Sequence, residues 1–269
     1  MQIDLLTSAT DLQNRVQQSF RRGLPSYHDA AKAQAEIARL LVDALCLAGA
    51  PSVFHHALEF GCGTGHLTSA LLQRLAIDHL ILNDLVAESA AALQPVLQDQ
   101  KVRSEFYAGP VETMPLPSGL DLIASASTVQ WLHDPAQVIA RLTIHLAPGG
   151  WLALSGFGQQ HFAELQALGG FAQAPSYLNP DDWAALLPAD MAIHTARQHN
   201  IKLHFPDAIS LLRHLRFTGV NARAHSHWTR ANLTDFEARL RKAQPKDSPL
   251  ALTYCPVILI ARKIADPER

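Results

Sequence analysis

The stretch LEFGCGTGHLT, residues 58–68, decides the fold of this chain. A short apolar strand is expected to end at Phe60, glycines follow at positions 61, 63 and 65, and an amphipathic helix is expected to begin near Leu67. Glycine allows a tight turn and lets a ligand come close to the backbone. Phosphate, dinucleotide and sulfonium cofactors all use such turns, so the neighbouring residues must identify the ligand.

Short apolar runs alternate with helical patterns around this turn. Helices are expected at 4–20 and 28–48, and Arg22-Gly23-Leu24-Pro25 is expected to separate them, because Gly and Pro interrupt helices. Strands are then expected at 55–60, 79–84, 102–107, 120–125 and 151–156, helices at 66–75, 87–98 and 135–146, and a Pro-Gly-Gly turn at 148–150. This alternation predicts right-handed crossovers and a parallel sheet. Beyond Gly158 we expect helices near 161–168, 180–187, 207–217 and 232–243, and a last strand at 252–261.

The composition is that of an ordinary soluble protein, with 48% hydrophobic and 17% charged residues among 269. No apolar stretch is long enough to span a membrane, and the N-terminus lacks a signal-peptide pattern. Cys46, Cys62 and Cys255 lack CxxC spacing and the 14 histidines form no HExxH motif, so neither a disulfide framework nor a metal site is predicted. We expect a cytoplasmic protein.

The net charge of -2 conceals a segregated distribution. Between Arg197 and Lys246, ten Lys and Arg stand against three Asp and Glu, a formal charge of +7, whereas the other residues carry 12 Lys and Arg against 21 Asp and Glu. A localised positive field attracts acidic partners, although a solvated helical surface without a partner carries such charges equally well. We call residues 197–246 the basic window.

Residues around the glycines narrow the choice of cofactor. The spacing is GxGxG, and His66 stands where a dinucleotide fingerprint has its third small residue, which disfavours nicotinamide and flavin cofactors. No GK[ST] follows, which excludes a Walker-type phosphate loop. Asp84 ends the next strand, where a carboxylate can accept hydrogen bonds from both ribose hydroxyls. Glu59 favours a cationic group such as an ammonium and would repel a pyrophosphate.

These motifs are similar to motifs I and II of class I S-adenosylmethionine-dependent methyltransferases. Over nearly its whole length, the chain resembles the malonyl-[acyl-carrier-protein] O-methyltransferases of biotin synthesis. The resemblance includes Phe20, Tyr27 and Gln34, the blocks 109–117, 121–135 and 146–157, and the stretches 211–222 and 249–263, of which the last two carry the family assignment.

The resemblance implies a Rossmann-like class I methyltransferase fold of the α/β class. Its mostly parallel seven-stranded sheet would carry helices on both faces, N-terminal helices and a helical lid insertion. The implied divisions are an N-terminal helical segment covering the cofactor at 1–50, a methyltransferase core with the basic helical insertion at 51–158 and 190–269, and a lid or substrate segment at 159–189.

The implied reaction transfers a methyl group from S-adenosyl-L-methionine, leaving S-adenosyl-L-homocysteine, to the free carboxylate of a malonyl group. That group is carried on the phosphopantetheine of an acidic acyl carrier protein, and its methyl ester is a primer for pimeloyl and biotin synthesis. The basic window would guide the carrier, and we expect a monomer that binds neither nucleic acid nor membrane. A class I methyltransferase acting on another small carboxylate or metabolite, a non-catalytic S-adenosylmethionine-binding factor and an enzyme that modifies nucleic acid are the alternatives.

The cofactor-binding residues implied by the resemblance follow the glycine turn and the strand ends. They are Tyr27, Gln34, Glu59, Gly61, Cys62, Gly63, Asp84, Leu85, Val111, Glu112, Ser125 and Ala126. Pro110 stands where related enzymes usually have an acidic residue that holds the adenine amino group. Adenine would therefore be held by backbone near Val111, by Glu112 or by apolar contact alone.

A carboxylate nucleophile is already ionised at neutral pH, so this reaction needs no general base. Catalysis can come mainly from holding the donor carbon close to the acceptor oxygen. We expect Tyr27 to face the sulfonium, Trp131 to wall the methyl-transfer pocket, and Arg213 to fix the malonyl carboxylate through two parallel hydrogen bonds. Ordinary packing of the two aromatic rings and an exposed helix arginine are the alternatives.

Overall fold

The computed structural model describes residues 9–169, 174, 176–218, 229–242, 244 and 248–265. Predictions for residues 4–8, for the end of the 211–222 stretch, and for Arg223 and Lys246 of the basic window lie outside the described residues. The chain divides into two compact units. The first unit comprises residues 1–31, 162–173 and 202–253, and the second comprises 32–161, 174–201 and 254–269.

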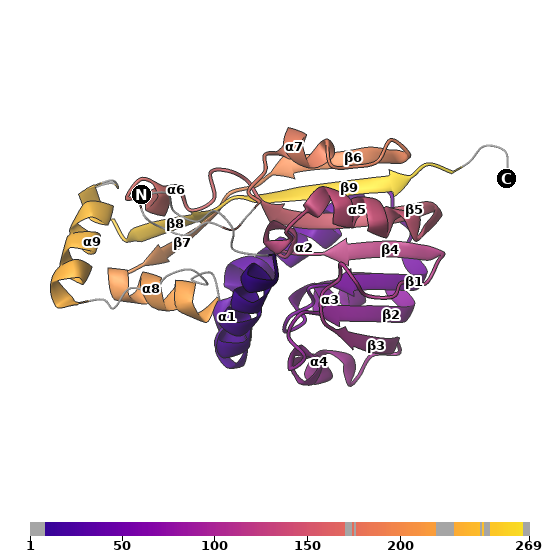
Figure 1. The fold of residues 1–269 in the computed structure, drawn as a ribbon, viewed down its shortest axis with the longest axis horizontal. Coiled ribbons are helices and arrows are strands. Elements are labelled where there is room, and N and C mark those ends of the chain that lie inside the picture. Colours follow the sequence, from indigo (N-terminus) through magenta and orange to yellow (C-terminus); the bar gives the residue numbers. More distant parts are fainter. Residues whose placement is uncertain are drawn as a thin grey trace. The chain divides into compact units, whose positions relative to one another are not determined.

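The second unit is built on a seven-stranded sheet with the strand order β3-β2-β1-β4-β5-β9-β6. Neighbours among the first five of these are parallel, whereas β9 runs antiparallel to both β5 and β6. The mostly parallel sheet predicted from the alternation is confirmed (Figure 1). The strands are β1 (Val53–Phe60), β2 (Ala76–Asp84), β3 (Arg103–Ala108), β4 (Leu120–Ser125), β5 (Leu146–Phe157), β6 (Met191–Gln198) and β9 (Pro256–Lys263).

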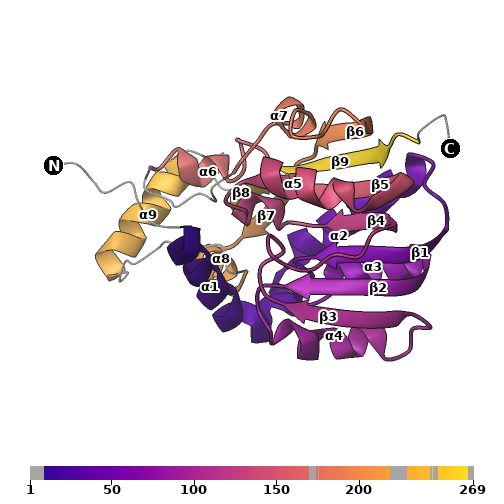
Figure 2. The ribbon, with the colours of Figure 1, turned by 45° about the vertical axis from the view of Figure 1, so that its right-hand side comes forward.

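Helices cover both faces of this sheet, and Figures 1 and 2 show α2 and α5 on opposite sides of it. Strands β4 and β9 are nearly continuous apolar runs, as expected for strands buried on both faces. Asp134 caps α5 by accepting a hydrogen bond from Gln137 N at 2.9 Å, and Pro135 occupies its first turn, where no N–H is needed. The helices of this unit are α2 (Lys32–Leu47), α3 (His66–Arg74), α4 (Ser89–Leu97), α5 (Pro135–Ile144), α7 (Pro180–Ala184) and the 3-10 helix η1 (Val129–Trp131).

The predicted break at Arg22-Gly23-Leu24-Pro25 is wrong. Helix α1 (Ala9–Ala30) continues through it with Pro25 inside, and the interruption falls at Ala31. The Ser26 hydroxyl, next to the proline, donates to the Gly23 carbonyl at 3.1 Å. Helix α1 packs on α8 in the same unit, and such packing outweighs local helix propensity.

The single strand predicted at 252–261 is also wrong, because the run is divided at Cys255. Strand β8 (Leu250–Tyr254) pairs with β7 (Ile201–Phe205), whereas β9 begins at Pro256 in the large sheet. The N–H of Cys255 donates to His161 Nδ1 at 3.3 Å instead of to a neighbouring strand, and Pro256 has no N–H. Strands β6 and β7 were not predicted. Strand β5 begins before the predicted Pro-Gly-Gly turn, which instead forms an irregularity in its pairing with β4.

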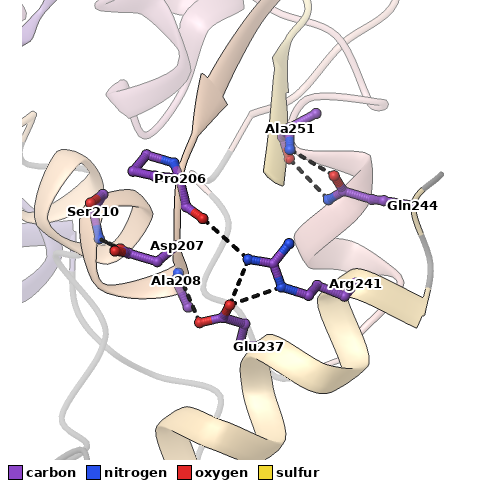
Figure 3. A network of polar contacts seen from close by, with 8 residues as sticks. All are labelled: Pro206, Asp207, Ala208, Ser210, Glu237, Arg241, Gln244 and Ala251. Carbon is purple, nitrogen blue, oxygen red and sulfur yellow. Dashed lines mark hydrogen bonds and ion pairs between the residues drawn. The ribbon is translucent and has the colours of Figure 1, made fainter. Parts of the chain in front are cut away.

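The first unit contains α1, α6 (Ala163–Gln166), α8 (Ala208–Phe217), α9 (Arg230–Lys242), β7 and β8. Polar contacts fix α9 within it (Figure 3). Glu237 accepts from Ala208 N at 3.2 Å and from Arg241 Nε at 2.8 Å, and Arg241 also donates to the Pro206 carbonyl at 3.1 Å. Two hydrogen bonds join the side chain of Gln244 to the backbone of Ala251. Within the described ranges, every helix is too short or too polar to cross a bilayer.

Candidate cofactor and methyl-acceptor site

The glycine turn follows β1 and presents bare backbone. At Gly61, with φ of 67°, a Cβ atom would lie 2.1 Å from Thr128 Oγ1, so only glycine fits there. Gly63 has φ of 53° and no atom within 4 Å of where its Cβ would be. The N–H of Cys62 donates to the Asn83 carbonyl at 3.1 Å, which ties the turn to β2. The backbone at Gly63 is therefore open to a ligand.

Asp84, the last residue of β2, holds the loops at this edge together. Its Oδ2 accepts from Gly63 N at 2.7 Å, and its Oδ1 accepts from Val86 N at 2.8 Å. Each carboxylate oxygen has a second lone pair, so both can still accept a hydrogen bond from a ligand hydroxyl. Burial raises the pKa of Asp84 above its ordinary value, and the N–H groups of Val86 and Gly63 and the side chain of Ser89 oppose that rise.

Glu59 is a buried carboxyl, only 1% exposed, at the penultimate position of strand β1 before the glycines. Its Oε2 accepts from Thr68 Oγ1 at 2.8 Å, and its Oε1 has no hydrogen-bond partner among the described residues. Burial raises the pKa of Glu59 to about 8, and the nearby negative charge of Asp84 adds to the rise. A cationic donor would supply the missing hydrogen bond and stabilise the ionised form.

Gln34 lies on α2 and is 7% exposed. Its Oε1 also lacks a partner within the described part of the chain. An unpaired buried oxygen is costly, so this acceptor is a second group suited to a ligand N–H. Leu85, predicted to contact the cofactor, is half-buried directly after β2.

The loop after β4 lies against the glycine turn. The Ser125 hydroxyl donates to the Phe60 carbonyl at 2.7 Å, so it joins β4 to β1. Thr128 Oγ1 lies 3.3 Å from the Gly61 carbonyl and 3.2 Å from the Ala126 carbonyl. Ser127 has φ of 56°, a conformation that serine rarely adopts and that clusters at functional sites. Nothing in the sequence signals this backbone feature.

The segment predicted to hold adenine is fixed from two sides. Asn83 Nδ2 donates to the carbonyls of Tyr107 and Gly109, and Arg141 donates to those of Val111 and Met114. The Val111 side chain is buried in the core and Glu112 is half-buried. Neither Asn83 nor Arg141 was predicted as a site residue, since their partners are backbone atoms distant in sequence. Binding of adenine at Val111 or Glu112 stays a prediction.

The three predicted catalytic residues are divided between the units. Trp131 is half-buried at the end of η1, in the same unit as the glycine turn. Tyr27 on α1 meets Phe20 edge-on at 6.3 Å, and Arg213 is exposed on α8, both in the first unit. The roles of Tyr27, Trp131 and Arg213 at the cofactor stay predictions. Among the described residues, no three His, Cys, Asp or Glu side chains form a potential metal site.

Sequence reasoning missed an aromatic cluster at the carboxyl end of β5. The His161 ring stacks on Phe157 at 3.9 Å and meets Tyr177 at 5.2 Å and Tyr254 at 5.1 Å. Burial lowers the pKa of His161 well below its ordinary value, so the ring is neutral. The surface that these four rings form at the carboxyl end of β5 is therefore uncharged.

The open backbone at Gly63, the unmatched acceptor of Glu59 and the carboxylate of Asp84 suit a nucleoside that carries a cationic amino acid. The fold and site define a class I S-adenosylmethionine-dependent methyltransferase. A family model described as a methyltransferase domain matches residues 58–154. The chain belongs to the family of malonyl-[acyl-carrier protein] O-methyltransferases. It is 33% identical to the member from Chlorobium luteolum over 92% of this chain and 94% of that one, and 33% identical to the member from Acinetobacter baylyi over 92% and 96%.

Solved structures share the fold at low sequence identity. The YcgJ protein from Bacillus subtilis superposes with a TM-score of 0.59 at 13% identity and covers 84% of this chain and 98% of its own. The N-methyltransferase NodS from Bradyrhizobium japonicum, solved with S-adenosyl-L-homocysteine, gives a TM-score of 0.51 at 17% identity, over 94% of this chain and 100% of its own.

Proposed function

We propose that this enzyme methylates the free carboxylate of a malonyl group carried by acyl carrier protein, forming the methyl ester that primes pimeloyl and biotin synthesis. The observation that carries the proposal is similarity to malonyl-[acyl-carrier protein] O-methyltransferases along more than nine tenths of the chain. The core methyltransferase domain alone, at residues 58–154, would be compatible with many acceptors.

S-adenosylmethionine supplies an electrophilic methyl group on a sulfonium. Glu59 receives the ammonium of the methionine part through the oxygen that lacks a partner among the described side chains. Asp84 accepts from the ribose hydroxyls with its remaining lone pairs, and the open backbone at Gly63 admits the cofactor to the turn. Gln34, Cys62, Leu85 and Ala126 complete the proposed contacts.

The acceptor needs positioning rather than deprotonation. Trp131 walls the transfer pocket, Tyr27 closes the methionine end, and Arg213 is the proposed clamp for the malonyl carboxylate. Holding reactants in a good orientation can lower the activation barrier by up to ~7 to 11 kcal/mol. Methyl transfer can therefore be catalysed by a site that has no pair of proton-transfer residues.

The proposal includes a cytoplasmic monomer that does not bind nucleic acid. Cys46, Cys62 and Cys255 form no disulfide, which supports a reducing compartment. Sedimentation of the purified protein tests whether it is a monomer. Binding of labelled RNA at physiological salt would contradict the proposal that the protein does not bind nucleic acid.

The decisive experiment incubates the purified protein with S-adenosylmethionine and malonyl-acyl carrier protein and measures the product mass. One added methyl group is the expected result, and cleavage of the thioester should transfer that added mass to the released acyl group, which locates the methyl group on the malonyl unit. Free malonate and malonyl-coenzyme A are the comparison acceptors. Methylation of free malonate with no preference for the carrier-bound thioester would contradict the proposed substrate.

A further inference from the structure

The outer face of α8 combines two cations with two exposed apolar side chains. Its buried residues Ala208, Leu211 and Leu215 lie along one side of the helix. At about 3.6 residues per turn, positions 209, 213, 216 and 217 fall together on the opposite side. We call Ile209, Arg213, Arg216 and Phe217 the α8 face.

The exposure of these four residues agrees with this geometry. Ile209 is 43% exposed and Phe217 is 41% exposed, and both arginines are exposed. Single exposed apolar residues are common, but two of them flanking a pair of cations on one helical face form a coherent surface.

The charges of α8 differ from those of α9 in their local partners. In α9, Asp235 lies 3.9 Å from Arg239, and Glu237 lies 2.7 Å from Arg241. Arg241 is further held by the Pro206 carbonyl (Figure 3). Helix α8 has no acidic residue of its own, and the described structure gives neither Arg213 nor Arg216 an ion pair. Asp207 caps the helix and accepts from Ser210 N at 2.7 Å, and its pKa is lowered mainly by Ser210 and in part by the positive charge of Arg213.

We propose that the α8 face is the docking surface for an acidic helix of the acyl carrier protein that also exposes apolar side chains. This inference rests on the proposed function, because the partner is the carrier of the malonyl group. Arg213 and Arg216 would pair with carboxylates of that helix, and Ile209 and Phe217 would pack between them. Charge complementarity therefore selects the partner, and the apolar pair fixes its orientation.

Docking gives Arg213 a role that competes with the carboxylate clamp. The phosphopantetheine arm separates the carrier surface from the malonyl end, so an arginine contacting the carrier does not also contact the malonyl carboxylate. Docking requires mainly positive charge, whereas the clamp requires the planar fork of a guanidinium. Loss of turnover in Arg213→Lys with wild-type carrier binding would therefore assign Arg213 to the clamp and leave the docking surface to Arg216, Ile209 and Phe217.

The first test measures binding of fluorescently labelled acyl carrier protein without its arm, so that catalysis is not involved. We expect Arg216→Glu and Phe217→Ser each to raise Kd about tenfold at low salt. The loss in Arg216→Glu should shrink as salt screens the interaction. Arg230→Glu on α9 makes the same charge change at an exposed position outside the α8 face and serves as the matched control. Circular dichroism confirms that each variant is folded.

The second test compares malonyl-acyl carrier protein with malonyl-coenzyme A as substrates. Arg216→Glu should raise KM about tenfold for the first and leave the second unchanged. Equal losses with both substrates, wild-type carrier binding in Arg216→Glu, or equal effects of Arg216→Glu and Arg230→Glu would each overturn the docking surface. A wild-type dimer that Phe217→Ser dissociates would assign the face to a second copy and also overturn it. If the wild-type enzyme methylates neither thioester, the proposed function fails, and the binding test still decides the docking surface.

Discussion

The hydroxyl of Thr68 donates to the carboxyl of Glu59 at 2.8 Å, in a region closed to solvent. It meets only one of the two carboxyl oxygens, and the other has no partner in the described structure. Burial outweighs the hydrogen bonds that the neutral hydroxyl and backbone of Thr68 donate, so the carboxyl favours its protonated form. Protonation of Glu59 is therefore coupled to folding and, through the proposed role of Glu59, to cofactor binding.

Folding stability should fall as pH rises. The pKa of Glu59 is raised by burial from 4.5 to about 8, so between these values the native state keeps a proton that the unfolded chain has lost. Glu59→Gln removes the cost of keeping this carboxyl protonated or burying its charge. The variant should therefore have a free energy of unfolding roughly 1–3 kcal/mol above that of the wild type near pH 8, and a smaller difference near pH 4.5. Urea denaturation across this range measures it, and a difference independent of pH would contradict the assignment.

Binding of S-adenosylmethionine should release a proton from Glu59. In the proposed site the cofactor ammonium would stabilise the ionised carboxyl, so calorimetric enthalpies in buffers of different ionisation enthalpy should reveal the release at pH 7. In Glu59→Gln the part of the release due to this residue should vanish and affinity should drop at least tenfold. Equal proton release by both proteins would exclude Glu59 as its source.

Asp84→Asn should lower both the folding stability and the affinity for the cofactor. An amide can accept at only one of the two positions now facing Gly63 N and Val86 N, and its NH₂ group would oppose the other N–H. The expected destabilisation is roughly 1.5–3 kcal/mol, typical for hydrogen bonds to a charged group. Asp78→Asn, at an exposed carboxylate beside His55, is the control and should change stability little. Similar losses in the two variants would show that Asp84 does not organise the turn.

Gly61→Ala should cost more than Gly49→Ala, although both glycines have positive φ. A Cβ at Gly61 meets Thr128 Oγ1 at 2.1 Å, whereas a Cβ at Gly49 has no atom within 4 Å. The control measures backbone strain alone, about 1 kcal/mol, and the collision adds to it at Gly61. Thermal unfolding and S-adenosyl-L-homocysteine titration provide the two readouts. Equal costs at the two sites would mean that Thr128 moves aside freely.

Tyr27→Ala and Trp131→Ala should lower turnover in folded protein, because each is proposed to shape the methyl-transfer pocket. A cation–aromatic contact contributes ~0.5 to 2 kcal/mol, so the loss of Tyr27 should reduce kcat/KM by up to about 30-fold. Tyr107→Ala, on edge strand β3 and 41% exposed, is the control. Unchanged kinetics in folded variants would remove both residues from the site.

The sequence predicted the glycine turn, Glu59 and Asp84 because the carboxyl ends of parallel strands meet at one sheet edge. It did not predict the positive φ of Ser127, the contacts of Arg141 or the aromatic cluster around His161, since each depends on partners far away in the sequence. The α1 break was predicted from local propensity, which packing against α8 overrides. Strand β6 was not predicted because its polar side chains obscure the alternation by which strands are recognised, whereas β7 alternates clearly but is only five residues long.

Strand β9 lies between β5 and β6, and it follows the other six strands of the sheet in the sequence. During translation, the ribosome therefore completes β5 and β6 before the residues that join them have been made. The unpaired edges of both strands stay open to wrong partners in the nascent chain until 256–263 emerge. Final assembly of the sheet therefore waits for β9, and a chaperone that shields strand edges would raise the folding yield of this unit.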